Sequence, residues 1–465
     1  MLEVMKKCLC CMVVLLTMSC WQALAQEKTT LRLFDEVTFY DGYQFENNPD
    51  KDLQDGILRH STSLYAVRLT DEQLSLIGDS LWMNVSIKAC CDNYDRIGNV
   101  NLAFVPKGAT TYDPFATTRI ELGRFITPFM NKNKKPDVVP YAYDIHYVSH
   151  ILRDSKWRTD YDLWMELELF GIPYAAQQQV TGCNNRSDVF KGTLELVTTQ
   201  PAAQSTSDDV LVPIVMKKPE YKGHNLNNYS ELGTDTIGKT TKTYVFDVPE
   251  DVNDAHLVIV TSNHGANENG EEYNRRWHYI YVDDELMLTY KPGRTSCEPF
   301  RKYNTQRNGI YGLSKKSDET WQSFSNWCPG DVIDNRIIQL GSFPQGQHKV
   351  RISVPEAEFA DKQGDIPVSM FFQGLTNGKL HIGIDPVYAQ PSKHLTTLRI
   401  EGNQLCITAQ EPIVGIELYD LQGRLYRRTG ATPSVDISSL QPAYYLVNVE
   451  LENGIIETQK VLLRK

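Results

Sequence analysis

Apolar and polar residues alternate along much of the chain, which is typical of β-strands that bury one face. The clearest run, residues 81–87, reads Leu-Trp-Met-Asn-Val-Ser-Ile, and residues 99–105 alternate again after a short loop. Similar runs occur at 30–37, 64–69, 119–126, 139–144, 162–170 and 191–198. Short strands separated by polar turns predict an antiparallel sandwich over residues 27–199. Within it, residues 41–60 are expected to form a loop and residues 145–153 a helical turn.

A second strand-rich domain is expected over residues 210–387, after a polar linker at 200–210. Its strands are predicted at 211–216, 242–248, 256–261, 276–282, 286–290, 336–340, 348–354 and 366–373. Residues 291–330 form a long, polar stretch without a repeating pattern, which is typical of a functional loop or of a disordered segment. A linker at 388–396 then precedes a small all-strand module at 396–465.

The length, composition and net charge of the chain fit this domain organisation. The chain has 465 residues, 41% of them hydrophobic and 23% charged, which suits two or three domains with buried cores. Its formal net charge of −11 argues against nucleic acid or an anionic membrane surface as a partner.

Residues 1–25 are expected to form a secretory signal peptide. Two lysines precede an apolar run at 8–18, and a small-x-small cleavage site ends at Ala25. The run is too short to span a membrane, and no other membrane span is visible. Lipidation of Cys20 is the alternative, which we disfavour because Thr17 stands where a lipidation motif needs an aliphatic residue.

Two of the predicted strands enclose a loop that carries two aspartates, a tyrosine and an arginine. Residues 91–96 read Cys-Asp-Asn-Tyr-Asp-Arg, and loops held by rigid strands are where functional sites usually lie. This stretch resembles the Cys-Asp-x-aromatic-Asp-Arg signature of the bacterial peptide:N-glycosidase F family. Residues 120–129, Ile-Glu-Leu-Gly-Arg-Phe-Ile-Thr-Pro-Phe, are also similar to that family, and the resemblance covers roughly residues 30–390.

The resemblance implies an all-β fold with two tandem eight-stranded antiparallel jelly rolls. It also implies an amidase that removes N-linked glycans from asparagine without a cofactor. Such hydrolysis needs an activated water and a stabilised leaving nitrogen, which two carboxylates with different pKa values can provide. The alternative is a jelly-roll protein that binds glycans without catalysis.

The resemblance implies that Asp95 is the principal catalytic acid/base, although a loop aspartate often only caps its own backbone. Asp92 is expected to be a structural cap or a sugar contact. Arg96 is expected to bind a carboxylate or a sugar hydroxyl, since its planar fork suits both. Tyr94 either stacks on a sugar ring or is a core aromatic residue.

The resemblance implies a second catalytic carboxylate in the other domain. The pair Glu272-Tyr273, with His278 six residues after the acid, matches the family spacing, so Glu272 is the candidate. Glu271 is the alternative, because a shift of one residue in a strand reverses the face to which a side chain points. Tyr273, His278 and His264 are expected to contact substrate.

The chain departs from the family at several of these places. Tyr174 keeps an aromatic residue that is expected to bind substrate, but Ile172 replaces the family's third acid. Gly270 and Asn274 stand where the family has cysteines that flank the second acid. Trp327, in a Trp-Cys-Pro-Gly stretch shared with the family, is expected to contact substrate.

Six cysteines follow residue 25: Cys90, Cys91, Cys183, Cys297, Cys328 and Cys406. Export makes disulfides the expected state. The resemblance implies a Cys297–Cys328 bridge, which argues for an ordered loop at 291–330. Cys183 is expected to pair with Cys90 or Cys91. We expect no metal: these six cysteines contain no Cys-x-x-Cys pair, and the histidines form no ligand set for zinc or copper.

The last module resembles the C-terminal sorting domain of type IX secretion in Bacteroidetes, which implies the type IX machinery as a partner. An immunoglobulin-like accessory β-sandwich is the alternative. The whole sequence therefore predicts a monomeric, secreted or cell-surface peptide-N-glycosidase that acts on N-glycosylated proteins or glycopeptides.

Overall fold

The computed structural model describes residues 28–44, 53–199, 208–215, 226, 239–265, 271–306, 311, 314–323, 326–359, 364–380, 396–409, 411–420, 425–452 and 456–463. The expected signal peptide at 1–25 and most of the expected linkers at 200–210 and 388–396 lie outside these residues. In the part that is described, no helix has both the length and the apolar character needed to cross a bilayer.

Two antiparallel sheets form the first domain. The four-stranded sheet has the order β1-β9-β4-β7, and the six-stranded sheet has the order β15-β6-β5-β8-β3-β2. The strands that belong to this domain are β1 (Lys28–Tyr40), β2 (Ile57–Ser61), β3 (Leu64–Arg68), β4 (Leu81–Ala89), β5 (Ile97–Pro106), β6 (Thr118–Ile126), β7 (Val138–Asp144), β8 (Tyr161–Leu169) and β9 (Asp188–Thr199). The expected eight-stranded sandwich is thus larger, because β2 forms where a loop was expected and β15 joins from the second domain.

The alternation seen in the sequence explains which strands cover which face. In β4 every second side chain is buried, so one face lies on the core and the other near solvent. In β5, by contrast, all residues from Gly98 to Val105 are buried. A strand of this kind is covered on both faces: one face of β5 lies in the main core, and the other packs against Tyr112 and Trp164 of the same domain. The strand that follows the candidate loop is therefore an interior strand of the first domain.

Helices are short and lie at the ends of strands. They are α2 (Asp71–Ser75), α3 (Val148–Arg153), α4 (Ser155–Asp160), α5 (Tyr174–Gln179), the 3-10 helix η2 (Glu298–Tyr303) and α7 (Asp318–Gln322). The α3 helix lies where a helical turn was expected. A capping box begins α2, in which the Thr70 hydroxyl accepts from the Gln73 N–H and the Gln73 side chain accepts from the Thr70 N–H.

The second domain consists of two four-stranded antiparallel sheets, β10-β18-β12-β16 and β11-β17-β13-β14. The strands are β10 (Asp209–Val215), β11 (Thr241–Val248), β12 (Val252–Thr261), β13 (His278–Val282), β14 (Glu285–Tyr290), β16 (Arg336–Phe343), β17 (Gly346–Ser353) and β18 (Val368–Leu375). Between β14 and β16, the short strand β15 (Val332–Ile333) pairs with β6 of the first domain. One segment of the second domain is thus hydrogen-bonded into a sheet of the first.

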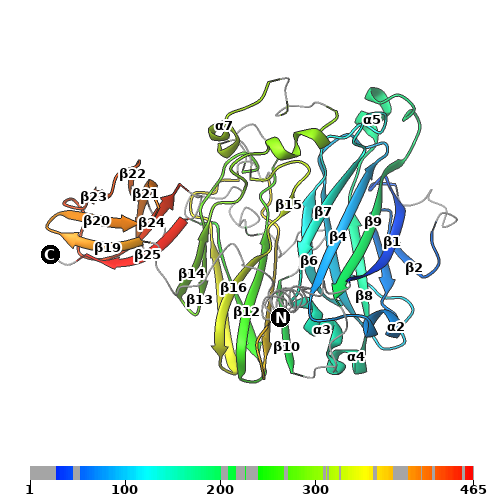
Figure 1. The fold of residues 1–465 in the computed structure, drawn as a ribbon, viewed down its shortest axis with the longest axis horizontal. Coiled ribbons are helices and arrows are strands. Elements are labelled where there is room, and N and C mark those ends of the chain that lie inside the picture. Colours follow the sequence, from blue (N-terminus) through cyan, green and yellow to red (C-terminus); the bar gives the residue numbers. More distant parts are fainter. Residues whose placement is uncertain are drawn as a thin grey trace, which may run out of the picture.

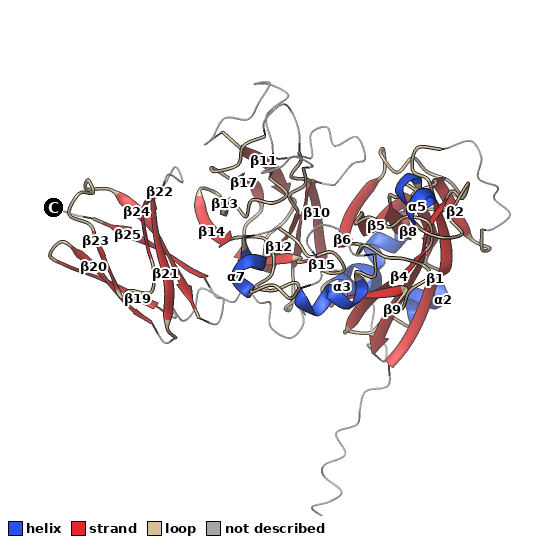
Figure 2. Cartoon of the chain, turned by 90° about the horizontal axis from the view of Figure 1, so that it is seen from above, coloured by secondary structure: helices blue, strands red, loops and turns tan. Residues whose placement is uncertain are grey.

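The C-terminal module has its own core between the sheets β19-β20-β23 and β22-β21-β24-β25. Its strands are β19 (Thr396–Glu401), β20 (Gln404–Ala409), β21 (Ile413–Asp420), β22 (Leu425–Thr429), β23 (Ser434–Asp436), β24 (Tyr444–Leu451) and β25 (Ile456–Leu462). Figures 1 and 2 show the three units in a row, with the second domain between the first domain and the module.

A buried polar cluster joins the two larger domains. Arg124 of β6 forms a two-pronged ion pair with Glu121, at 2.7 and 2.8 Å, and both side chains have no exposed surface. The same guanidinium donates to the Ser262 hydroxyl at 2.8 Å and to the Pro367 carbonyl at 3.0 Å in the second domain. Ser369 in turn donates to Glu121 at 2.5 Å. We call Glu121, Arg124, Ser262 and Ser369 the interdomain clamp.

Arg124→Met tests how much the interdomain clamp stabilises the fold. The variant leaves the Glu121 carboxylate buried without its cation, so we expect the free energy of unfolding to fall by about 3–5 kcal/mol. Urea denaturation measures this change. The control is Arg32→Met at an exposed ion pair, with an expected loss below about 1 kcal/mol. Equal losses in the two variants would contradict a special role for the clamp.

Candidate active site

The loop between β4 and β5 is organised around one buried carboxylate. Asp92 is 1% exposed and accepts hydrogen bonds from the Tyr94 N–H at 2.9 Å and the Ile172 N–H at 2.7 Å. The Arg96 Nε–H donates to the same carboxylate at 2.7 Å. Because its oxygens are occupied by these donors, Asp92 holds the loop in shape.

Thr127 attaches this loop to the end of β6. Its hydroxyl accepts from the Arg96 N–H at 2.7 Å and donates to the Tyr94 carbonyl at 3.2 Å. Its own N–H donates to the Arg96 carbonyl at 2.8 Å. These bonds lie on both sides of Asp95, so the backbone before and after that residue is fixed.

Tyr94 packs into an aromatic cluster. Its ring meets Phe129 edge to face at 5.8 Å between centroids, and the Arg96 guanidinium lies 5.5 Å from the ring centre. The cluster continues through Tyr311 and Trp321 of the second domain. Tyr94 is therefore half-buried between the domains, and much of its ring is covered by protein.

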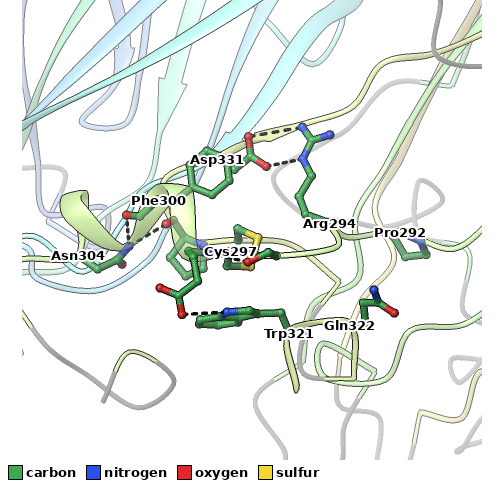
Figure 3. The surroundings of a disulfide bond; sticks show 12 residues. Pro292, Arg294, Cys297, Phe300, Asn304, Trp321, Gln322 and Asp331 are labelled. Atoms are coloured by element: carbon green, nitrogen blue, oxygen red, sulfur yellow. Dashed lines mark hydrogen bonds and ion pairs between the residues drawn. A yellow bond between two sulfur atoms is a disulfide. The ribbon is translucent and has the colours of Figure 1, made fainter. Parts of the chain in front are cut away.

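Two disulfides fix the surroundings of the loop. Cys91 pairs with Cys183, which leaves Cys90 as a buried free thiol. Cys297 pairs with Cys328 and closes the long polar segment between β14 and β15 (Figure 3). The first bridge therefore joins the candidate loop to a segment 92 residues away, and the second packs in the aromatic cluster around Tyr94.

Hydrogen bonds order the segment closed by the second bridge. The Asn304 side chain donates to the Phe300 and Pro329 carbonyls at 2.9 and 3.0 Å. Arg294 pairs with Asp331 at 2.6 Å, as Figure 3 shows. The expectation that residues 291–330 form an ordered loop thus holds for their described part, 291–306, 311, 314–323 and 326–330.

The two adjacent glutamates in the second domain have different surroundings. Glu271 is 2% exposed, pairs with Arg276 at 3.0 Å and accepts from the Glu358 N–H at 3.0 Å. Glu272 is half-buried and accepts from the Gly265 N–H at 3.1 Å. Burial raises the pKa of Glu272, while hydrogen bonds from Gly265 and from the Tyr273 hydroxyl oppose that rise. Glu271 thus has a structural role through its ion pair with Arg276, whereas no cation is a partner of Glu272 among these contacts.

Asn326 holds the backbone on which both glutamates lie. Its side-chain NH2 group donates to the carbonyls of Glu271, Glu272 and Asn274 at 2.6, 2.8 and 3.1 Å. Its own N–H donates to the Glu272 carbonyl at 3.2 Å. No sequence pattern indicates this role, because a neutral residue that binds carbonyls belongs to no motif.

Asp95 and Glu272 interact across the domain interface. Burial and, next in size, the negative charge of Glu272 raise the pKa of Asp95 to about 7, although Arg96 opposes the shift. Two like charges influence each other in this way only when they lie close together in a poorly solvated place. The structure thus brings together the two carboxylates that sequence reasoning selected.

His264 connects the interdomain clamp with the backbone that binds Glu272. The His264 ring Nε2 lies 2.7 Å from the Ser262 hydroxyl, which also accepts from Arg124. The His264 ring stacks on Trp327 at 5.8 Å, and the Trp327 indole N–H donates to the Asn263 carbonyl at 3.0 Å. These contacts position the residue next to Gly265, whose N–H holds Glu272.

The other candidate residues differ in their access to ligand. Tyr174 begins α5 and is 48% exposed, beyond the Ile172 backbone that binds Asp92. Trp327 is only 7% exposed. His278 has no exposed surface, stacks on Tyr290 at 4.8 Å, and burial lowers its pKa to about 3. The expectation that His278 contacts substrate is corrected: β13 begins at this residue and all its side chains are buried.

Within the described residues, no three or more His, Cys, Asp or Glu side chains are grouped as metal ligands. The groups gathered at this place are two carboxyl groups with raised pKa values, an arginine and tyrosine hydroxyls.

Comparison with family models gives two matches in chain order. Residues 30–186 match the N-terminal domain of peptide-N-glycosidase F, and residues 231–373 match its C-terminal domain. Together these matches cover well over half of the chain. No curated protein sequence matches it.

Solved structures share the two-domain β-sandwich fold. PNGF-II is 19% identical with a TM-score of 0.51, over 76% of this chain and 66% of that protein. Recombinant peptide:N-glycanase F is 14% identical with a TM-score of 0.50, over 76% and 97%. A peptide-N(4)-(N-acetyl-β-D-glucosaminyl)asparagine amidase is 14% identical with a TM-score of 0.50, over 76% and 98%.

The chain thus spans just under two thirds of the length of PNGF-II. At these identities the structural matches establish the fold alone. The two consecutive family models show that the chain belongs to the peptide-N-glycosidase F family.

Proposed function

We propose that the chain hydrolyses the amide bond between the core N-acetylglucosamine and asparagine in N-glycosylated proteins or glycopeptides. The observation that carries this proposal is the coupling of Asp95 and Glu272 across the domain interface. Family membership supplies the reaction class. The products are the glycan as its glycosylamine and a peptide with aspartate in place of asparagine.

The paired carboxyl groups divide the work of hydrolysis. The ionised member takes a proton from water as the water oxygen bonds to the side-chain carbonyl carbon. The protonated member gives its proton to the glycosylamine nitrogen as the carbon–nitrogen bond breaks. Burial and the charge of Glu272 raise the pKa of Asp95 to about 7, so Asp95 holds a proton more readily near neutral pH, as this division requires.

Neighbouring residues are proposed to orient the substrate. Arg96 lies beside Asp95 in sequence, and its side chain is held by Asp92 with one face on Tyr94. It is therefore positioned to bind an oxygen of the substrate amide or sugar. Tyr273 and the exposed Tyr174 offer ring and hydroxyl surfaces for a sugar.

A second candidate function is glycan binding without turnover. Ile172, at the position of the family's third acid, favours it, because the chain lacks one of the acidic groups that the family has at its site. A denatured N-glycoprotein separates the candidates: hydrolysis converts asparagine to aspartate, whereas a binding protein retains the intact glycoprotein on a column.

We also propose export and a surface or secreted location. The pattern of residues 1–25 supports a signal peptide, and the resemblance of residues 396–465 to a type IX sorting domain supports that route. We expect a monomer, because the two carboxyl groups come from one chain.

Substitution of either carboxylate should abolish most of the turnover. We expect Asp95→Asn and Glu272→Gln each to lower kcat/KM by about 10²–10⁴-fold, measured by mass spectrometry of a glycopeptide. Glu271→Gln is the matched control, because it removes the ion pair with Arg276 and should reduce stability more than kcat. Equal activity losses at Glu271 and Glu272 would contradict the assignment.

The pKa of Asp95 should depend on its partner. In Glu272→Gln the repelling charge is gone, so we expect the pKa of Asp95 to fall below about 7. Carbon-13 NMR of the labelled carboxyl carbon measures the titration. Glu271→Gln should leave the Asp95 pKa unchanged, and an unchanged pKa in Glu272→Gln would contradict the proposed coupling.

The raised pKa also predicts how stability depends on pH. The Asp95 pKa is near 3.8 when unfolded and about 7 when folded, so the folded state binds more protons between these values. The contribution of this group is complete below about pH 4 and is lost as pH rises through about 7. Asp95→Asn should therefore be more stable than the parent at pH 8 by roughly 1–3 kcal/mol, with no gain near pH 4. Denaturation midpoints that shift equally at both pH values would contradict this.

A further inference from the structure

The C-terminal module presents an apolar pair to the second domain. Tyr419 of β21 and Leu446 of β24 are cross-strand partners, and both are buried. Their sequence neighbours Leu418 and Val447 belong to the module's own core. Side chains alternate between the faces of a sheet, so Tyr419 and Leu446 lie on the outer face. This face is covered by protein outside the module.

The covering residues follow the loop that carries Glu272. Trp277, Tyr279 and Tyr281 form one buried cluster with Tyr419 and Leu446. The rings of Tyr279 and Tyr419 meet edge to face, with centroids 5.6 Å apart. Trp277 ends the loop, and Tyr279 and Tyr281 lie on β13 (Figure 1). The module therefore packs on the strand that fixes one end of the loop.

Charge is complementary across the same contact. Lys291 of the second domain lies 4.8 Å from the centre of the Trp277 ring and interacts with the charges of Glu417 and Glu450 in the module. Arg275, within the loop, also interacts with Glu450. Glu450 of the module thus interacts with two cations of the second domain, whereas Glu417 is paired within the module with Arg428, whose charge repels Lys291.

Arg275 connects this contact with the disulfide-closed segment. Its Nε–H donates to the Pro292 carbonyl at 2.6 Å, and its Nη1 donates to the Gln322 carbonyl at 3.0 Å. Figure 3 shows Pro292 and Gln322 near the Cys297–Cys328 bridge. The loop at 271–277 is therefore held by Asn326 at one end and by Arg275 and Trp277 at the other.

The fit leaves one cavity of about 240 Å³, lined by Trp277 and Lys291 from the second domain and by Glu417, Arg428 and Glu450 from the module. This space is wide enough for solvent to reach the charged groups. Water at such a place lets the charges remain ionised, so the cavity is compatible with a contact that persists in solution.

We propose that the C-terminal module is a structural part of the hydrolytic unit, because it packs on the loop that positions Glu272. The module acts as a positioning element through Trp277 and β13 and does not touch substrate. The effect on activity rests on the proposed amide hydrolysis, whereas the effect on the loop does not.

Hydrogen exchange in the full-length chain tests this proposal. The double variant Tyr419→Ser/Leu446→Ser removes the apolar pair, and Tyr444→Ser is the matched control, since Tyr444 lies on the same strand but is 46% exposed. We expect the double variant to raise the exchange rates of amides in residues 271–282 by about tenfold or more, and the control to leave them unchanged. Unchanged rates in the double variant would overturn the proposal.

Charge exchange keeps the test decisive if the double variant does not fold. Lys291→Glu should raise the same exchange rates by repulsion from Glu450, and adding Glu450→Lys should restore them. Absence of rescue would overturn the proposed contact. For an active chain, kcat/KM should fall about tenfold in Lys291→Glu and recover in the paired variant. If the parent chain proves inactive, the proposed hydrolysis fails, and the exchange rates still decide the role of the module.

Discussion

The candidate site depends on a fixed position of one β-sandwich against the other, and the ion pair of Arg124 with Glu121 enforces it. A buried charge is tolerated only when it is paired and its remaining hydrogen bonds are made. Here Ser262, Pro367 and Ser369 of the second domain supply those bonds. Any displacement of the domains would leave buried charge unsatisfied, so the interface has one favourable arrangement.

The same interface determines the chemistry of the site. Asp95 lies in the β4–β5 loop. Thr127 attaches this loop to the end of β6, close to the clamp residue Arg124. Glu272 is held by Gly265, next to His264, whose ring contacts Ser262 of the clamp. Burial of both acids between the domains raises their pKa values, which is unfavourable for folding near neutral pH. The clamp and disulfides offset that cost.

Much of the fold could be predicted from the sequence, because alternation with period two identifies strands that bury one face. This alternation is a weaker signal where a strand is short or is covered on both faces. The β2 strand was expected to be a loop, since it lies in a region with many turn-forming residues. The pairing of β15 with β6 involves two residues from a different domain, and no local pattern indicates such a contact.

The candidate site could be predicted in part for a related reason. Asp95 and Glu272 belong to motifs, and the structure adds a physical reason to distinguish Glu272 from Glu271, namely the ion pair of Glu271 with Arg276. Asn326 was missed because its task is to bind backbone carbonyls. His278 is expected from its spacing to contact substrate, but it lies in the buried strand β13, because spacing along the chain does not tell which side chains a strand buries.

The central claim is that paired carboxyl groups direct water to the carbonyl carbon of a glycosylated asparagine. Hydrolysis of a defined N-glycopeptide in oxygen-18 water, followed by mass spectrometry of the peptide, tests it most directly. The account predicts an aspartate with one oxygen-18 atom and a released glycan that retains its innermost N-acetylglucosamine. A peptide that keeps its asparagine, with or without that sugar, would contradict the account.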